Sequence, residues 1–87
     1  MDTLAKEHRQ VGAKQVWFEG ELLHVVLTDE RVVTLPIKQV SWLRWLVNAT
    51  PEERADWSIE PGGYAVYWES LDDGFEIAHA LSLEPVL

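Results

Sequence analysis

The sequence predicts an α+β fold: an antiparallel three-stranded meander, a helix, a short capped helix, then one or two further strands and a C-terminal helical turn. Short β-favouring runs separated by turn residues fill the first half of the chain. A proline then opens an apolar stretch with helical spacing, and a helix-capping signature precedes a second group of aromatic runs. The 87 residues are the size of one domain.

We expect three parts along the chain. Residues 1–12 form a flexible or short helical arm, residues 13–83 a single α+β domain, and residues 84–87 a tail. The arm is polar with scattered apolar positions, whereas strand-like patterns begin immediately after it. No internal repeat or linker divides the remainder.

The meander is expected from three apolar runs, at residues 16–18, 22–27 and 31–35. Alternation along the second run places Leu23, Val25 and Leu27 on one face, which we assign to the core. The same alternation puts His24 on the other face, as a partly exposed strand histidine.

Two helices should follow. Pro36 favours a helix start, and the apolar positions after it predict a helix over about residues 37–47. Its apolar arc is broad, so the edge carrying Trp42 and Trp45 is expected to face a second layer, a loop or a partner. Thr50, Pro51 and Glu53 match a capping box and predict a short helix over about residues 51–56.

The last third of the sequence predicts a strand, a turn and a second strand. Residues 57–59 and 64–68 flank a Pro-Gly-Gly turn and pair with each other, or the second run joins the meander. Residues 75–77 add a short extended stretch and residues 78–83 a helical turn that Pro85 ends. The expected core residues are Leu23, Val25, Leu27, Leu43, Leu46, Trp57, Val66 and Trp68.

The charge and composition of the chain argue against several classes of function. The net charge is −8, and residues 56–87 carry seven acids without any Lys or Arg. Phosphate-backbone binding needs surplus cations, so we expect no direct contact with nucleic acid. The chain contains no cysteine, which excludes disulfides and thiolate zinc sites. Without a long apolar run or a signal-peptide core, we expect a cytoplasmic protein that makes no membrane contact.

Catalytic and metal-binding patterns are not found. No nucleophile, base and orienting group can be assembled from the residues present, so we expect no enzyme, no catalytic residue and no cofactor. A weaker alternative is an enzyme that uses Asp72 and Asp73, although adjacent carboxylates diverge. The three histidines lack ligand spacing, and the acids at residues 69–76 do not match an EF-hand, so no metal site is expected.

Five tryptophans are unusual in a chain this short. Large rings can fill the core of a small domain, and this explanation is favoured for Trp57 and Trp68. Trp42, Trp45 and Tyr67 are the better candidates for an aromatic contact patch, because aromatic residues dominate interface hot spots.

The order of residues from about 22 to 81 resembles a bacterial family, DUF2442. The resemblance rests on residues 23–29 (LHVVLTD), Leu35-Pro36, residues 49–54 (ATPEER), Trp57, residues 66–68 (VYW) and Leu71-Asp72. The chain departs from the family pattern at Glu30, where glycine is usual, at residues 44–46, where Pro-Arg-Leu is usual, and at Gly74, where an acid is usual.

The resemblance implies a small α+β domain without attached enzymatic activity. Some members are fused to a helix-turn-helix DNA-binding domain, and this chain resembles the stand-alone type. Stand-alone members are often encoded beside a second small protein, and such pairs are suspected of being toxin–antitoxin modules.

The resulting hypothesis is a protein-interaction module, in one form the antitoxin-like member of such a pair. Its acidic C-terminal third would dock a basic protein partner, because single-sign charge steers a complementary partner and rings supply contact area. A homodimer through Trp42 and Trp45 is an alternative, as are acids that only maintain solubility. A second function class is a transcription-associated regulatory or ligand-sensing domain that acts through a partner. The candidate partner-binding residues are Tyr67, Glu69, Asp72, Asp73, Glu76, Trp42 and Trp45.

Overall fold

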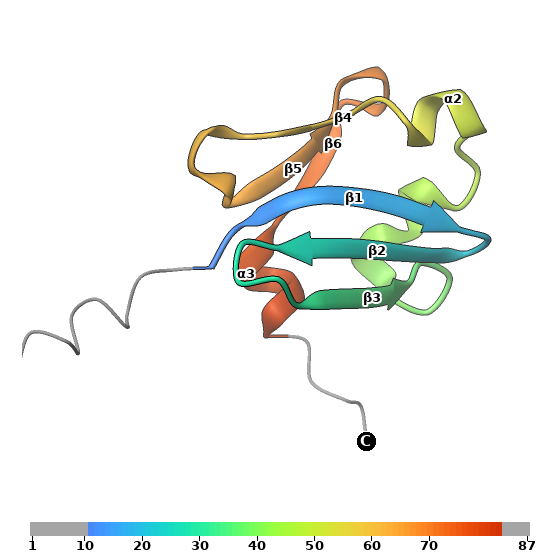
Figure 1. Cartoon of the computed structure of the whole chain (residues 1–87). Helices are drawn as coiled ribbons and strands as arrows, with labels where there is room; N and C mark the ends of the chain where they lie inside the picture. Colours follow the sequence, from blue (N-terminus) through green and yellow to red (C-terminus); the bar gives the residue numbers. More distant parts are fainter. Residues whose placement is uncertain (1–10, 83–87) are drawn as a thin grey trace, which may run out of the picture.

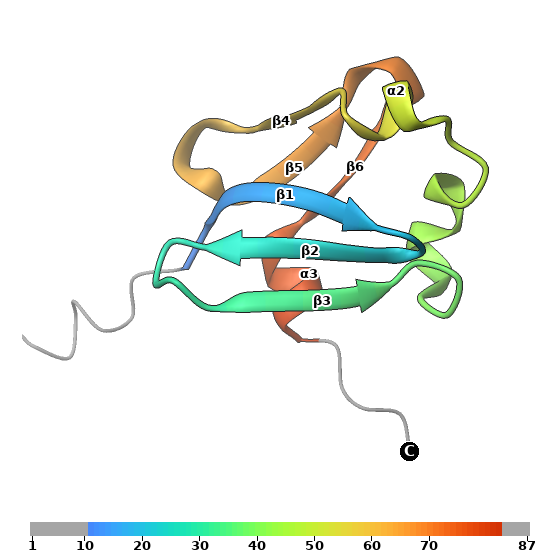
Figure 2. The ribbon, with the colours of Figure 1, turned by 45° about the vertical axis from the view of Figure 1, so that its right-hand side comes forward.

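The described part of the chain folds into two three-stranded antiparallel sheets, with strand orders β1-β2-β3 and β4-β5-β6. The computed structural model describes residues 11–82. The second sheet begins beyond the β1 edge of the first, β6 passes behind β1 and β2, and the C-terminal helix α3 lies behind β2 and β3 (Figures 1 and 2). The α+β class and the N-terminal meander are therefore confirmed. The second sheet has three strands, where the sequence predicted one or two.

The first sheet consists of β1 (Ala13–Glu19), β2 (Leu22–Leu27) and β3 (Val32–Pro36). The predicted alternation holds, because Leu23, Val25 and Leu27 are 0–1% exposed. Pro36 is the last residue of β3 and does not start a helix as expected, because a turn follows it. A proline is tolerated there because β3 is an edge strand, where one ladder hydrogen bond is dispensable.

The outward face of this sheet carries a small polar and aromatic cluster. Trp17 stacks on His24 with ring centroids 4.6 Å apart. The His24 ring nitrogens lie 2.8 Å from Thr34 Oγ1 and 2.9 Å from Glu19 Oε1. His24 is half-buried, as the sequence predicts.

The chain enters the first sheet through a fixed residue. Gly12, expected at the end of the N-terminal arm, donates to Thr28 Oγ1 at 3.1 Å and accepts from the Thr28 N–H at 2.8 Å. The rest of that arm and the expected tail lie outside the described residues.

The predicted helix over residues 37–47 is wrong in type and extent. A turn occupies residues 37–39, and a 3-10 helix, η1 (Ser41–Leu46), follows an extended Val40. The buried residues of this segment are spaced by three, the period of a 3-10 helix and not of an α-helix. They are Ile37, Val40, Leu43 and Leu46.

The capping box is confirmed at α2 (Pro51–Arg54), which is a single turn and shorter than expected. Thr50 Oγ1 accepts from the Glu53 N–H at 3.1 Å, and Glu53 Oε1 accepts from the Thr50 N–H at 2.9 Å. The helix ends early because the chain turns at Ala55 into the second sheet.

The second sheet consists of β4 (Trp57–Ile59), β5 (Ala65–Trp68) and β6 (Asp73–Glu76). The 3-10 turn η2 (Pro61–Gly63) joins β4 to β5, and the 3-10 turn η3 (Glu69–Leu71) joins β5 to β6. Trp57 lies opposite Trp68, which confirms that the two aromatic runs pair with each other.

The core fills the space between the sheets around Trp68, which is 0% exposed. Its ring meets Trp45 edge-on at 5.5 Å and stacks with Phe75 at 6.0 Å. Every core residue named from the sequence is buried except Trp57, which is half-buried because the edge strand β4 leaves one side of its ring uncovered. The expected C-terminal helical turn is α3 (Ile77–Leu81).

Among residues 11–82, no helix has the length and apolar character needed to cross a membrane.

Candidate functional site

Tyr67 lies at the centre of the residues that the sequence proposed for partner binding. Val66 and Trp68 point into the core, so alternation along β5 turns Tyr67 to the outer face of the second sheet. Its hydroxyl donates a hydrogen bond to Asp72 Oδ1. Asp72 adopts a left-handed conformation (φ 52°, ψ 44°) that aspartate tolerates well, and this turns its carboxylate back towards β5.

Three acids act on the Tyr67 hydroxyl, one by direct contact and two by their charge. The hydrogen bond to Asp72, partial desolvation of the phenol and the charges of Asp72, Glu69 and Asp73 raise the pKa of Tyr67 to about 12. The structure therefore brings together four of the residues proposed from the sequence.

Glu76 belongs to the same face but not to the same loop. It pairs with Ala65 at the far end of β6, on the outer face of the sheet. Together with Glu60, Tyr67 and Gly74 it lines a shallow groove of about 260 Å³. Glu76 and the loop acids thus flank Tyr67 along one surface.

Trp42 and Trp45 lie on the other side of the second sheet. Trp42 stacks on His79 at 4.6 Å and contacts Phe75 at 5.6 Å. Trp45 packs on Trp68 and donates its Nε1–H to the Trp42 carbonyl oxygen at 2.8 Å. Both rings are half-buried against the core, so they cannot share one contact patch with Tyr67.

Asp72 and Asp73 have separate partners. Asp72 accepts from Tyr67, whereas Asp73 Oδ1 accepts from the Gly74 N–H at 2.8 Å. The two carboxylates therefore point to different partners, in agreement with the divergence expected for adjacent residues. Within the described part of the chain, no three His, Cys, Asp or Glu side chains gather in a way that could hold a metal ion.

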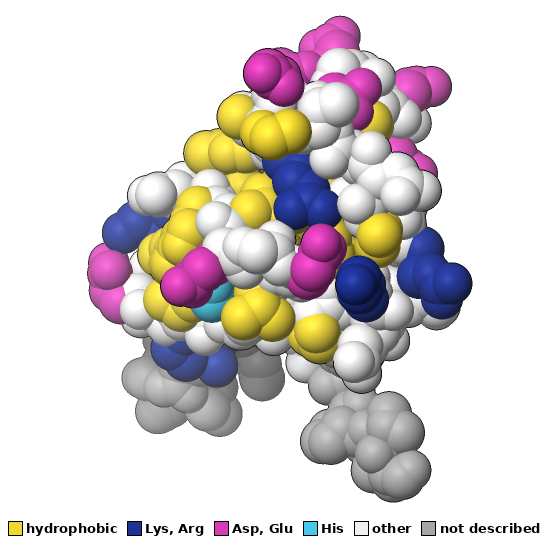
Figure 3. All heavy atoms as spheres, turned by 90° about the vertical axis from the view of Figure 1, so that its right-hand side faces the viewer, with side chains coloured by type: hydrophobic (Ala, Val, Ile, Leu, Met, Phe, Trp, Pro, Cys, Tyr) yellow, Lys and Arg dark blue, Asp and Glu magenta, His cyan; other side chains and the backbone are white. Residues whose placement is uncertain are grey.

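The acids extend beyond the β5–β6 loop to α2. Asp56 Oδ2 accepts from the Ser70 N–H at 3.0 Å, which fixes the end of α2 against η3. Glu52, Glu53, Asp56 and Ser70 line a hollow of about 320 Å³ at this junction. We call Glu52, Asp56, Glu69, Asp72 and Asp73 the acidic end. Figure 3 shows acidic side chains gathered at one end of the molecule, above a stretch of apolar surface.

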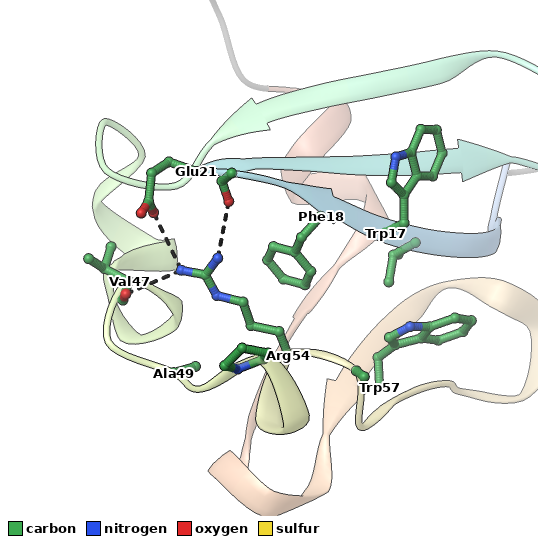
Figure 4. Close-up of a pocket in the computed structure, with 11 residues that line it drawn as sticks. Trp17, Phe18, Glu21, Val47, Ala49, Arg54 and Trp57 are labelled. Atoms are coloured by element: carbon green, nitrogen blue, oxygen red, sulfur yellow. Dashed lines mark hydrogen bonds and ion pairs between the residues drawn. The ribbon is translucent and has the colours of Figure 1, made fainter.

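A pocket between the two sheets was not foreseen from the sequence. It measures about 560 Å³ and lies between β1, the segment before α2, and β4. The rings of Phe18 and Trp57 face it, whereas the ring of Trp17 turns away and stacks on His24; we call this site the aromatic pocket (Figure 4). Its lining residues are Val16, Trp17, Phe18, Gly20, Glu21, Val47, Ala49, Pro51, Arg54, Ala55 and Trp57.

Arg54 crosses one end of the aromatic pocket from α2 towards Glu21 (Figure 4). Its guanidinium donates to the carbonyl oxygens of Gly20 at 3.1 Å, Leu46 at 3.0 and 3.2 Å, and Val47 at 3.2 Å. Nη2 also lies 3.4 Å from Glu21 Oε1, and Cζ lies 5.0 Å from the centre of the Phe18 ring. The side chain is 16% exposed, so Arg54 closes the end of η1 and ties it to the β1–β2 turn.

Sequence reasoning missed this pocket because its walls come from distant segments. Arg54 and Gly20 are 34 positions apart, and no local pattern predicts their contact. One feature of the sequence could have indicated the pocket: Trp57 is a large ring in a very short apolar run. Because such a run forms a short strand at a sheet edge, one side of the ring is left uncovered.

Comparisons with known proteins identify the family and the fold. A protein of unknown function from Rhodospirillum rubrum has a similar structure, with a TM-score of 0.69 and 17% identity over 84% of this chain and 87% of that chain. An uncharacterised protein from Chromobacterium violaceum has a TM-score of 0.68 and 20% sequence identity, over 93% of this chain and 72% of that chain. No curated protein matches the sequence.

At these identities the two structures show a shared fold only. Residues 13–78 match the family DUF2442, described as a protein of unknown function, and this span covers both sheets. The chain therefore belongs to the DUF2442 family.

Proposed function

We propose that this protein is an interaction module that binds a basic protein partner through its acidic end. The observation that carries the proposal is the convergence of acids from separate elements on one end of the fold. Glu52 and Asp56 come from α2 and the residues after it, and Glu69 comes from η3. The Asp56–Ser70 hydrogen bond holds the two elements together.

The local charge is uncompensated. Between residues 51 and 76, eight acids face a single cation, Arg54. That cation is occupied by backbone carbonyls and Glu21, so it does not neutralise the outer acids. A field of one sign accelerates encounter with a partner of opposite charge and suppresses wrong partners.

Tyr67 supplies contact area beside these charges. Its ring lies on the outer face of the sheet, and the hydrogen bond to Asp72 restricts its motion. A ring that is already fixed loses little conformational entropy on binding.

The test is co-expression with the protein encoded by the neighbouring reading frame, followed by affinity purification of the complex. The variant Glu52→Lys/Glu69→Lys suits it because both residues belong to the acidic end and neither carboxylate accepts a hydrogen bond from residues 11–82. We expect a basic partner to co-purify with the wild type and to be lost from this variant.

The charge-matched control is Glu19→Lys/Glu30→Lys, which changes the net charge equally but acts on β1 and the β2–β3 turn. It removes the exposed contacts of Glu19 with His24 and of Glu30 with Lys14, which contribute little to stability. We expect this control to retain the partner. Equal loss from both variants would show that only the total charge matters, and retention by both would contradict the proposal.

A further inference from the structure

We infer that the aromatic pocket receives an apolar side chain of the basic partner, so that the partner's docking segment combines an apolar anchor with flanking Lys or Arg residues. This inference rests on the proposed function and names the chemistry of the segment that binds.

The pocket has the size and lining of a binding site for an apolar group. Its volume of about 560 Å³ falls within the range typical of ligand pockets, roughly 300–1,000 Å³. The rings of Phe18 and Trp57 line it, and both are only half-buried. Uncovered tryptophan in a concave site is typical of an interface hot spot.

The single cation in the pocket does not favour an anionic occupant. The guanidinium of Arg54 already donates to the carbonyl oxygens of Gly20, Leu46 and Val47, and it lies beside Glu21. An anion would have to displace these acceptors, whereas an apolar side chain would leave them in place. The pocket therefore selects for an uncharged, apolar group.

The surroundings of the pocket favour positive charge next to that group. Ala55 lines both the aromatic pocket and the acidic hollow that contains Glu52, Glu53 and Asp56. Arg54 is the only Lys or Arg among the lining residues of the two sites. A segment with a basic residue two or three positions from its anchor spans about 7–10 Å when extended, which matches neighbouring sites that share one residue.

Charge complementarity argues against a second copy of this chain as the occupant. The chain carries seven Lys and Arg against fifteen acids, so two copies repel each other on average. A partner with surplus Lys and Arg gains from the same field. Concentration-dependent dimers in sedimentation velocity that disappear on filling the pocket would contradict this assignment.

The first experiment fills the pocket from its rim. Ala55→Trp places a large ring at the edge shared by the two sites, and Ala78→Trp is the matched control on an exposed position of α3. With the co-expressed partner we expect at least a tenfold loss of affinity for Ala55→Trp and less than a twofold change for Ala78→Trp. Ala49→Leu, on another wall, provides a second filling variant should Ala55→Trp unfold.

The second experiment uses defined peptides. Lys-Lys-Leu-Leu-Lys-Lys carries the proposed anchor, and Lys-Lys-Ser-Ser-Lys-Lys keeps the charge without it. The tryptophan indole N–H signals in a ¹H–¹⁵N spectrum report the site of contact. We expect the leucine peptide to bind about tenfold more tightly, because burying a leucine side chain contributes roughly that factor in affinity. It should shift the signal of Trp57 more than that of Trp17, whose ring stacks on His24.

These outcomes separate the inference from the proposed function. If Ala55→Trp and Ala49→Leu keep the partner while Glu52→Lys/Glu69→Lys loses it, the acidic end binds and the pocket does not. Equal affinity of the two peptides, or an unchanged Trp57 signal with the leucine peptide, would also overturn the inference. If the wild type captures no basic partner, the proposed function fails as well.

Discussion

The indole Nε1–H of Trp68 donates a hydrogen bond of 3.0 Å to the carbonyl oxygen of Arg54. This contact joins the most buried ring of the second sheet to the last residue of α2. Because α2 carries one wall of the aromatic pocket and part of the acidic end, both candidate binding features are fixed to the core by this bond.

Trp68→Phe should lower the free energy of unfolding by about 2–4 kcal/mol, because it removes part of a buried ring and leaves the Arg54 carbonyl without its donor. Urea denaturation followed by circular dichroism measures the change. Trp17→Phe is the control, because Trp17 is 41% exposed, and we expect it to cost less than about 1 kcal/mol. Similar losses in the two variants would contradict the central position of Trp68.

Arg54→Lys should lower the free energy of unfolding by about 1–3 kcal/mol although it preserves the charge. An ammonium group cannot donate to the Gly20, Leu46 and Val47 carbonyls at once in the geometry that the planar guanidinium occupies. Arg44→Lys, at an exposed position of η1, is the matched control and should change stability by less than about 0.5 kcal/mol. Thermal and urea unfolding of both variants provide the comparison.

Asp72→Asn should lower the pKa of Tyr67 from about 12 towards its ordinary value of 10.0, because it replaces the charged carboxylate acceptor by a neutral amide and so removes a negative charge. The absorbance of the phenolate, followed in a Tyr64→Phe background, reports Tyr67 alone. Asp73→Asn is the control and should lower the pKa less, because Asp73 contributes only through its charge.

The raised pKa of Tyr67 makes the folding stability depend on pH in the alkaline range. The folded-state pKa of Tyr67 lies above the unfolded value, so its stabilising contribution is complete below about pH 10 and is lost as the pH rises towards 12. Wild type and Asp72→Asn should therefore differ in stability at neutral pH and converge at strongly alkaline pH. An unchanged stability difference across this range would contradict the Tyr67–Asp72 linkage.

Glu30→Gly should stabilise the protein by about 0.5–1 kcal/mol. Glu30 adopts a positive φ of 78° in the β2–β3 turn, where a side chain is strained and glycine is not. The change also removes the exposed ion pair with Lys14 (2.9 Å), which contributes little. Glu30→Ala is the control, since it removes the ion pair but keeps the strain, and its melting temperature should not exceed that of the wild type.

The sequence allowed good prediction wherever local periodicity and burial agree. Alternation in β2 identified its core face, and the residues around Thr50 identified the start of α2. The segment after Pro36 was assigned the wrong helix type because its aromatic residues fit an α-helical arc, while the residues that pack into the core repeat every three positions.

The candidate site was only partly predictable. Tyr67 and the acids that follow it are close in sequence, and their assembly around one hydroxyl follows from a short loop. The aromatic pocket depends on Arg54 reaching the β1–β2 turn and on an edge strand that leaves Trp57 half-covered. Both features depend on contacts between distant segments, so the spacing of residues within any one segment does not predict the pocket.

Each sheet is made of strands that follow one another directly in the chain, and this has a consequence for the order of folding events. Pairings between neighbouring strands close short loops, so each sheet can form early and by itself. The contacts of Arg54 with Gly20 and Glu21 span 33–34 positions and join the two halves, so they form when the sheets dock. Arg54→Lys should then accelerate unfolding while leaving the folding rate nearly unchanged.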